Sequence, residues 1–137
     1  MNKIIVLVFM VLGLGACAVT SNNIKSDLYE EYAKNQQLEE LKKISAFRFQ
    51  GWSALDDEHL IISVSLHKSY LVTLDHRCDG LSYATSIKVN QYMSSSLSSR
   101  FDSISVPKSM GPKCTFKSIH KLTKEQAKEI QKLDDKK

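Results

Sequence analysis

The strongest constraint on the fold is the stretch from Ile44 to Leu122, where apolar side chains recur at every second position. Leu60, Ile62, Val64 and Leu66 alternate with Ser63, Ser65 and His67. After the corner at 67–69, the apolar side chains continue on one face at Tyr70, Val72 and Leu74. This period is typical of half-buried strands, and the short corner predicts a hairpin. Because such short turns leave no room for crossover helices, the sheet is expected to be antiparallel.

Further strands are predicted on both sides of this hairpin. A strand over 47–50 runs into Gly51 and Trp52, and shorter strands are expected around Ile87 and Val89, over 101–106 and over 114–122. The Ser-rich segment Ser94–Ser99 is predicted to be a loop. The fold class that follows is mainly β, with a small antiparallel sheet or a partly closed barrel, one N-terminal helix and one short C-terminal helix.

The two helices are predicted to lie outside the β domain, which we place at residues 44–122. Residues 26–43 lack Gly and Pro and are rich in Glu, Gln, Lys and Leu, which favours a helix. Residues 123–137 form the C-terminal helix with a frayed tail, and Thr123 with Gln126 fits a capping box at its start.

The first seventeen residues are typical of a bacterial lipoprotein leader. A single Lys3 precedes an apolar run that is too short to span a bilayer, so residues 1–16 are predicted to be a signal peptide. The run ends in Leu14-Gly15-Ala16-Cys17, which resembles a lipobox, and Cys17 is therefore the predicted lipidation site. Residues 17–25 then form a lipidated tether. The resemblance to Gram-negative lipoproteins, in which inner-membrane retention usually shows Asp after the lipidated cysteine, implies from Ala18 the outer membrane, with the domain facing the periplasm.

The other two cysteines, Cys78 and Cys114, form an even pair in a chain predicted to be exported to an oxidising compartment. A disulfide between them would stabilise the fold by about 4 kcal/mol in the chain-entropy model. The alternative is a zinc site completed by His76 and His120. Zinc ligands usually come in closely spaced pairs, and exported thiolates tend to oxidise first, so the disulfide is the prediction. No metal or cofactor is expected.

Length and charge limit the class of protein further. A chain of 137 residues supports one small domain, and 42% hydrophobic with 25% charged residues is typical of a globular protein. The 19 basic and 15 acidic residues give a net charge of +4, which does not indicate a nucleic-acid partner.

Five blocks of residues follow one another in the predicted β domain: Phe47-x-Phe49-x-Gly51-Trp52, Tyr70-Leu71-Val72-x-Leu74, Cys78-x-x-Leu81-x-x-Ala84-x-x-Ile87, Arg100-Phe101-Asp102-x-Ile104-x-Val106 and Cys114-x-Phe116-x-x-Ile119-x-x-Leu122. With these blocks the chain resembles a family of small bacterial exported proteins and lipoproteins known only as a domain of unknown function. The resemblance covers residues 44–122 and implies the boundary of the β domain and the disulfide, but no activity.

Four residues are candidates for ligand binding. Arg100 and Asp102 share strand parity and are a candidate pair for gripping a ligand on one sheet face. The alternative is that Asp102 accepts hydrogen bonds from a neighbouring turn while Arg100 is solvated. Trp52 is a candidate for stacking on a sugar ring, and Tyr70 is either a ligand contact or a core residue with a satisfied hydroxyl.

The motifs of common enzymes are missing from the sequence: there is no G-x-S-x-G elbow, no H-E-x-x-H and no phosphate-binding Gly loop. The expected function is therefore a non-enzymatic, lipid-anchored envelope module that binds an envelope protein, a peptide or a glycan. The alternative is a hydrolase acting on envelope material, with Asp102 and either His67 or His120 as general acid and base.

Overall fold

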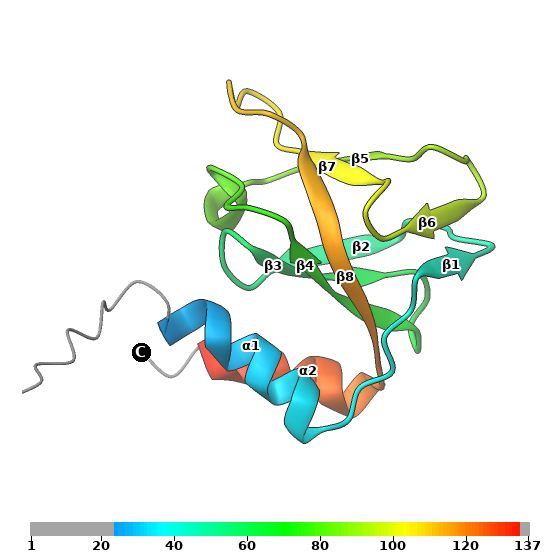
Figure 1. The fold of residues 1–137 in the computed structure, drawn as a ribbon, viewed down its shortest axis with the longest axis vertical. Helices are drawn as coiled ribbons and strands as arrows, with labels where there is room; N and C mark the ends of the chain where they lie inside the picture. The colour runs from blue at the N-terminus through cyan, green and yellow to red at the C-terminus, as the bar shows by residue number, and fades with distance from the viewer. Residues whose placement is uncertain (1–23, 135–137) are drawn as a thin grey trace, which may run out of the picture.

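The computed structural model describes residues 24–134. The predicted signal peptide over 1–16 and the lipidation site Cys17 lie outside the described residues. The described residues form two antiparallel sheets and two helices, arranged as in Figure 1, which confirms the predicted fold class: a mainly β fold whose larger sheet curls into a half-barrel. The elements are α1 (Ile24–Asn35), β1 (Lys43–Ser45), β2 (Gly51–Ala54), β3 (His59–Ser63), β4 (Ser69–Leu74), a 3-10 turn η1 (Leu81–Tyr83), β5 (Lys88–Asn90), β6 (Ser96–Ser98), β7 (Ser103–Ser105), β8 (Cys114–Leu122) and α2 (Lys124–Asp134).

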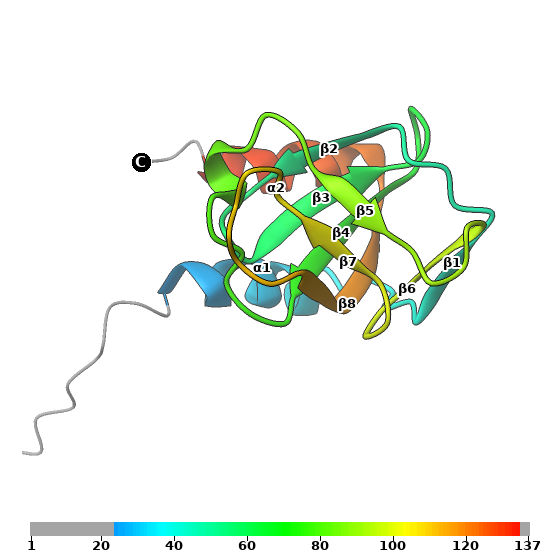
Figure 2. The same ribbon diagram turned by 90° about the horizontal axis from the view of Figure 1, so that it is seen from above.

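The larger sheet has six strands in the order β2-β3-β4-β8-β7-β5, and β1 pairs with β6 in a second, two-stranded sheet. β8 organises the fold because it pairs with β4 along one edge and with β7 at the start of its other edge. Residues 39–41 continue that other edge, where the Leu41 N–H donates to the Ile119 carbonyl at 2.8 Å. The sheet therefore curls around β8, as the view from above shows (Figure 2).

The central strands are buried on both faces, because alternate residues point to two separate apolar clusters. The inner face carries Leu60 and Val72 among others, and the curled sheet closes over it. The outer face carries Ile61 and Leu71, and the two helices cover it with Tyr29, Ala33 and Ile130. We refer to these two surfaces as the inner face and the outer face.

The disulfide between Cys78 and Cys114 is confirmed, with an S–S distance of 2.08 Å. Both residues are buried within the cluster of the inner face, so the bridge ties the loop after β4 to the first residue of β8. The zinc alternative is wrong because both sulfur atoms are used in the disulfide and neither remains as a thiolate ligand.

The hairpin, the last strand and the capping box are confirmed. β3 and β4 pair in the predicted hairpin with Ser63 opposite Ser69, but the turn covers 64–68 and not 67–69. The predicted extension of the strand to Leu66 is therefore wrong, and Leu66 is 85% exposed. β8 has the predicted bounds of 114–122. At the start of α2 the Thr123 N–H donates to Gln126 Oε1 at 2.9 Å, and the Gln126 N–H donates to Thr123 Oγ1 at 3.2 Å.

The helix predicted over 26–43 is too long, because α1 ends at Asn35. Gln37 has a φ of 49°, in the left-handed region, and the Leu38 N–H donates to the Ala33 carbonyl at 3.0 Å. A second bond, from the Gln37 N–H to the Lys34 carbonyl, completes a Schellman motif. Glycine is the usual residue at this position, so the sequence carried no signal for the helix end.

Three strand predictions also need correction. Residues 47–50 form no strand, because the chain turns at Ala46, whose φ is 54°, after the unpredicted β1. The Ser-rich segment Ser94–Ser99 is not entirely a loop, since Ser96–Ser98 pair with β1 and Leu97 is fully buried. The strand predicted over 101–106 is shortened to Ser103–Ser105.

Candidate functional site

A groove with a volume of about 450 Å³ lies on the outer face, between α1 and strands β4 and β8. Two segments contact the same edge of β8 here: residues 39–41 at Ile119 and Arg100 at Phe116. Lys117 and Ser118, which lie between these two contacts, line the groove. Residues that share the groove come from α1, the segment after it, β4, the turn before β7, and β8: Tyr29, Lys34, Glu40, Thr73, Arg100 and Lys117 among others.

The floor of the groove is mixed in character, because the outer face of β4 and β8 changes from apolar to polar residues here. Leu71 lies opposite His120 and Thr73 lies opposite Ser118 in the strand register, and all four line the groove. Nδ1 of His120 is buried and has no hydrogen-bond partner among the residues that the structure describes. A buried polar atom without a partner costs about 1–3 kcal/mol, which makes it a natural contact for a bound ligand or water.

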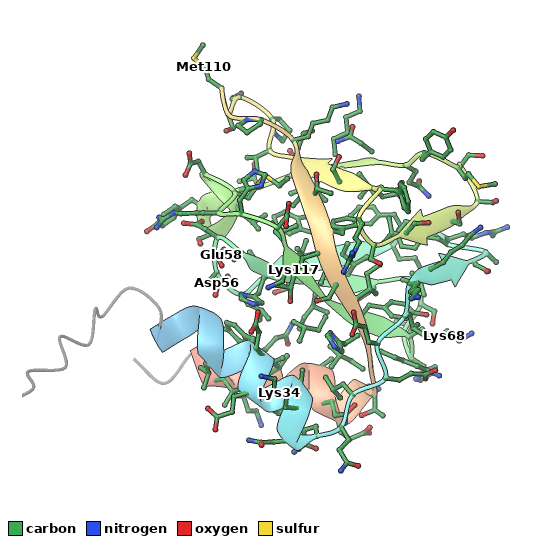
Figure 3. All side chains as sticks on the ribbon, viewed as in Figure 1. Lys34, Asp56, Glu58, Lys68, Met110 and Lys117 are labelled. Atoms are coloured by element: carbon green, nitrogen blue, oxygen red, sulfur yellow. A yellow bond between two sulfur atoms is a disulfide. The ribbon has the colours of Figure 1, made fainter. Side chains whose placement is uncertain are left out.

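Three cations from different parts of the chain line the walls. Lys117 Nζ lies 3.5 Å from Glu30 Oε1 across the groove, and both side chains are largely exposed, so this ion pair is weak. Neither Lys34 nor Arg100 forms an ion pair with another side chain of the described region. Figure 3 shows Lys34 on α1 and Lys117 on β8 on the same side of the molecule.

The groove continues past Arg100 and Lys117 into a second hollow of about 380 Å³, which Asp75 and Thr115 also line. The main chain at Arg100 is fixed in a left-handed conformation with φ of 69°, and its N–H donates to the Phe116 carbonyl at 2.6 Å. A residue other than glycine is uncommon in this conformation, and Arg100 lines both hollows.

A histidine–aspartate pair lies behind the wall of the groove. His59 Nδ1 is 3.0 Å from each carboxylate oxygen of Asp56, and the ring of Tyr29, which lines the groove, is centred 5.0 Å from the His59 ring. His59 has no exposed surface, and its Nε2 has no hydrogen-bond partner among residues 24–134. A carboxylate that orients a histidine is typical of general bases, but here the free nitrogen is closed off from solvent.

Asp57, the neighbour of this pair, joins two loops at the rim of the inner face. Its Oδ1 accepts hydrogen bonds from the Ser82 N–H at 3.0 Å and the Ser82 hydroxyl at 2.7 Å, and Oδ2 lies 2.8 Å from Arg77 Nη2. Burial opposes ionisation of this carboxyl, but the hydrogen bonds from Ser82 and the charge of Arg77 outweigh it and lower the pKa of Asp57. This cluster holds loops together and does not line the groove.

The sequence-predicted pair, Arg100 and Asp102, does not share one face. Arg100 lines the groove, whereas Asp102 is buried and accepts hydrogen bonds from the N–H groups of Tyr92 at 2.7 Å and Ser98 at 2.6 Å. That is the arrangement of the structural alternative for Asp102. Neither histidine proposed as its catalytic partner, His67 or His120, is among the hydrogen-bond partners that the structure gives it.

The two aromatic candidates lie away from the groove. Tyr70 is buried in the cluster of the inner face, where burial raises the pKa of its hydroxyl. Trp52 is half-buried on β2, opposite Ile62 of β3, and packs against the same cluster. Sequence reasoning missed Lys34, Glu30 and Lys117, because α1 and β8 meet only through tertiary packing.

Neither helix of the described region has the length and apolar character that a membrane span requires. A family model described as a family of unknown function, DUF6491, matches residues 1–137. The predicted likeness to a domain of unknown function is thus confirmed, over a longer region than residues 44–122. No curated protein and no solved structure matches the chain.

Proposed function

Since the chain belongs to the family of unknown function DUF6491, whose description names no activity, we propose a function from its own residues: a non-enzymatic, lipid-anchored envelope module that binds a ligand in the groove of the outer face. The observation that carries the binding part is the groove itself, in which Lys34 and Arg100 lack acidic partners among the described side chains and Nδ1 of His120 lacks a hydrogen bond.

The anchoring part of the proposal rests on the amino terminus. The short apolar leader and the Leu14-Gly15-Ala16-Cys17 sequence support acylation of Cys17, and Ala18 supports transfer to the outer membrane of a bacterium. The disulfide agrees with export, since such bonds persist mainly in oxidising compartments. Two or three acyl chains would hold a domain of this size firmly on a membrane.

The ligand part follows from the chemistry of the groove. Lys34, Arg100 and Lys117 favour a carboxylate or phosphate, while Thr73 and Ser118 offer hydroxyl groups to polar atoms. An envelope peptide or a glycan that carries an acidic group combines both kinds of contact. The non-enzymatic part is supported by His59, whose unpartnered nitrogen is closed off from any substrate in the groove.

Membrane attachment is tested by fractionating cells that produce the protein or its Cys17→Ser variant. The protein is expected in the membrane fraction. The variant is expected to carry no lipid and to keep its leader uncleaved. Partitioning of a processed, unacylated variant with membranes would contradict the proposal, and so would an unmodified Cys17 in the protein itself.

Ligand binding is tested by a photo-crosslinking amino acid at Gln37, which lines the groove, with Leu66 as the control because it is 85% exposed and does not line it. In intact cells, Gln37 is expected to give a discrete adduct that weakens when Lys34 and Arg100 are both replaced by Ala. Equal labelling at the two positions would contradict a binding groove. Hydrolysis of envelope material that disappears in His120→Gln would contradict the non-enzymatic role.

A further inference from the structure

A second surface with a distinct composition lies at the end of the molecule formed by β1, β6 and their adjoining turns. Strand pairing places Lys43 opposite Ser98, and the Ser99 N–H donates to the Lys42 carbonyl at 3.0 Å. We call the exposed residues of segments 42–49 and 92–101 the distal face. Figures 1 and 2 both show this end on the opposite side of the molecule from the start of α1.

The distal face is basic and has no exposed acidic group. Four exposed cations lie on its two segments: Lys42, Lys43, Arg48 and Arg100, the last of which also lines the groove. The sequence contains no Asp or Glu from 41 to 55 or from 80 to 101. Of the acids that border these stretches, Asp102 is buried and its carboxylate is occupied by the N–H groups of Tyr92 and Ser98, whereas Glu39 and Glu40 are exposed just before Lys42. The charge balance of the whole chain, only +4, therefore hides a local excess of positive charge.

The same face exposes large apolar side chains that the core does not use. Tyr92 is 88% exposed, Phe101 is 79% exposed and Met93 is 51% exposed. The hydrogen bond from the Tyr92 N–H to Asp102 Oδ1 ties the 92–93 turn to the residue that follows Phe101 in the chain. Phe49, 41% exposed, follows Arg48 on the neighbouring segment. Apolar groups this exposed, gathered on one end and mixed with cations, indicate an interaction surface.

We propose that the distal face docks on an anionic phospholipid surface. Tyr92, Met93 and Phe101 enter the headgroup region, where aromatic rings are favoured, and the cations neutralise lipid phosphates. Aromatic side chains that protrude from turns can insert between lipid headgroups, because the headgroup layer is deformable. Four cations spread over two segments suit a diffuse charge better than the dense charge of nucleic acid. The inference rests on the proposed function in one respect: the lipid anchor would hold the domain next to a membrane.

The test uses protein purified from cell membranes and added to vesicles of phosphatidylcholine, either alone or mixed with phosphatidylglycerol. Trp52, the sole tryptophan, is replaced by Phe, and a new tryptophan reports from Phe101→Trp or, as the control, from Tyr83→Trp. Tyr83 is 90% exposed in η1, outside the two segments of the distal face. Lipids with brominated acyl chains quench a tryptophan that enters the bilayer.

Tryptophan at 101 is expected to be quenched when phosphatidylglycerol is present and released from quenching at high salt, while tryptophan at 83 stays unquenched. Lys43→Gln and Arg48→Gln, which do not line the groove, are each expected to weaken the response about fivefold. Absence of phosphatidylglycerol-dependent quenching at 101 would overturn the proposal, as would equal quenching at both positions. Capture on immobilised polyglutamate without a response to vesicles would assign the face to an acidic protein and also overturn it.

Flotation with phosphatidylcholine vesicles alone separates this inference from the proposed function. Protein that floats with these neutral vesicles carries an anchor, whatever the tryptophan at 101 reports. Protein that fails to float with them but binds the anionic vesicles in a salt-dependent manner would refute the anchor and still support docking through the distal face.

Discussion

The two faces of the central strands differ in how completely they are sealed. The inner face is almost entirely apolar, the half-barrel closes over it, and the Cys78–Cys114 disulfide lies within its cluster. The outer face is covered by two helices at its apolar part, but it buries His59 and Thr73 and opens into the groove beside them. Strands β3, β4 and β8 supply residues to both faces, so one backbone serves a packed core and a recessed polar surface.

This difference separates the residues that stabilise the fold from those available for binding. The described region buries three side-chain atoms without a hydrogen bond: His59 Nε2 and His120 Nδ1 belong to the outer face, and Ser96 Oγ belongs to β6 of the smaller sheet. Unpaired buried nitrogens oppose folding, and a sheet kept only for its stability would replace them with apolar groups. The two unpartnered nitrogens of the outer face therefore oppose folding, whereas the cluster of the inner face buries no side-chain atom of this kind among the described residues.

The largest expected effect breaks the inner face. Replacing both Cys78 and Cys114 by Ala should lower the free energy of unfolding by about 4 kcal/mol, because the unfolded chain regains the entropy of an open loop. Denaturant titration of the protein and the double variant measures this. A reducing agent should destabilise the protein and leave the variant unchanged, and a difference below about 1 kcal/mol would contradict a structural disulfide.

The next largest effect is expected from weakening the packing of α2 against the outer face. Ile130 on α2 is fully buried against it, and Ile130→Ala should cost about 3 kcal/mol of unfolding free energy. The matched control is Leu28→Ala on α1, where a side chain already 38% exposed should cost less than about 1 kcal/mol. Protease sensitivity is expected to increase first within 124–134 in the Ile130 variant. Equal losses in the two variants would mean that α2 is not part of the packed outer face.

A smaller, pH-dependent effect concerns Asp57 at the rim of the inner face. Because its pKa is lowered in the folded protein, its ionised form stabilises the fold above its unfolded pKa of about 4, and this contribution is lost as the pH falls through the folded value. Asp57→Asn should cost about 1–2 kcal/mol near neutral pH. Melting temperatures of both proteins from neutral to acidic pH should converge at the acid end, and a constant gap would refute the role of ionisation.

The smallest effect sharpens the contrast between the faces. His120→Leu removes the buried nitrogen that lacks a partner and should raise stability by up to about 1 kcal/mol, while weakening the photo-crosslink from Gln37. Calorimetry of the variant against the unaltered protein measures the first change. Clear destabilisation, by about 2 kcal/mol or more, would mean that His120 is a structural residue, because losing an unpaired nitrogen cannot cost so much.

Sequence periodicity predicted the elements whose apolar and polar residues alternate within the segment itself. It missed the elements that form only through contacts with distant parts of the chain. β3, β4 and β8 were predicted because their alternation is visible within the segment, and the capping box at Thr123 is a local motif. β6 was missed, because three residues of a Ser-rich run become a strand only when Leu97 packs opposite Ile44. The end of α1 was missed because Gln37 occupies a position where glycine is the usual signal.

The candidate site was less predictable than the fold. Arg100 was identified from its place next to an apolar strand, and His120 was considered as an acid–base residue; both line the groove. Lys34 and Lys117 each resemble an ordinary solvated lysine in the sequence. The two lysines line the same groove only because α1 docks on the outer face. This docking brings together residues that are distant in the sequence, as the ion pair between Glu30 and Lys117 shows.

The account depends most directly on the chemical state of three sulfur atoms, which intact-mass analysis of the protein purified from cells without reducing agent measures at once. We predict a chain that begins at Cys17, carries a diacylglycerol and fatty-acid adduct there, and lacks two hydrogens because Cys78 and Cys114 are joined. A chain that retains residues 1–16 with an unmodified Cys17, or one in which Cys78 and Cys114 react with a thiol reagent, would contradict the account.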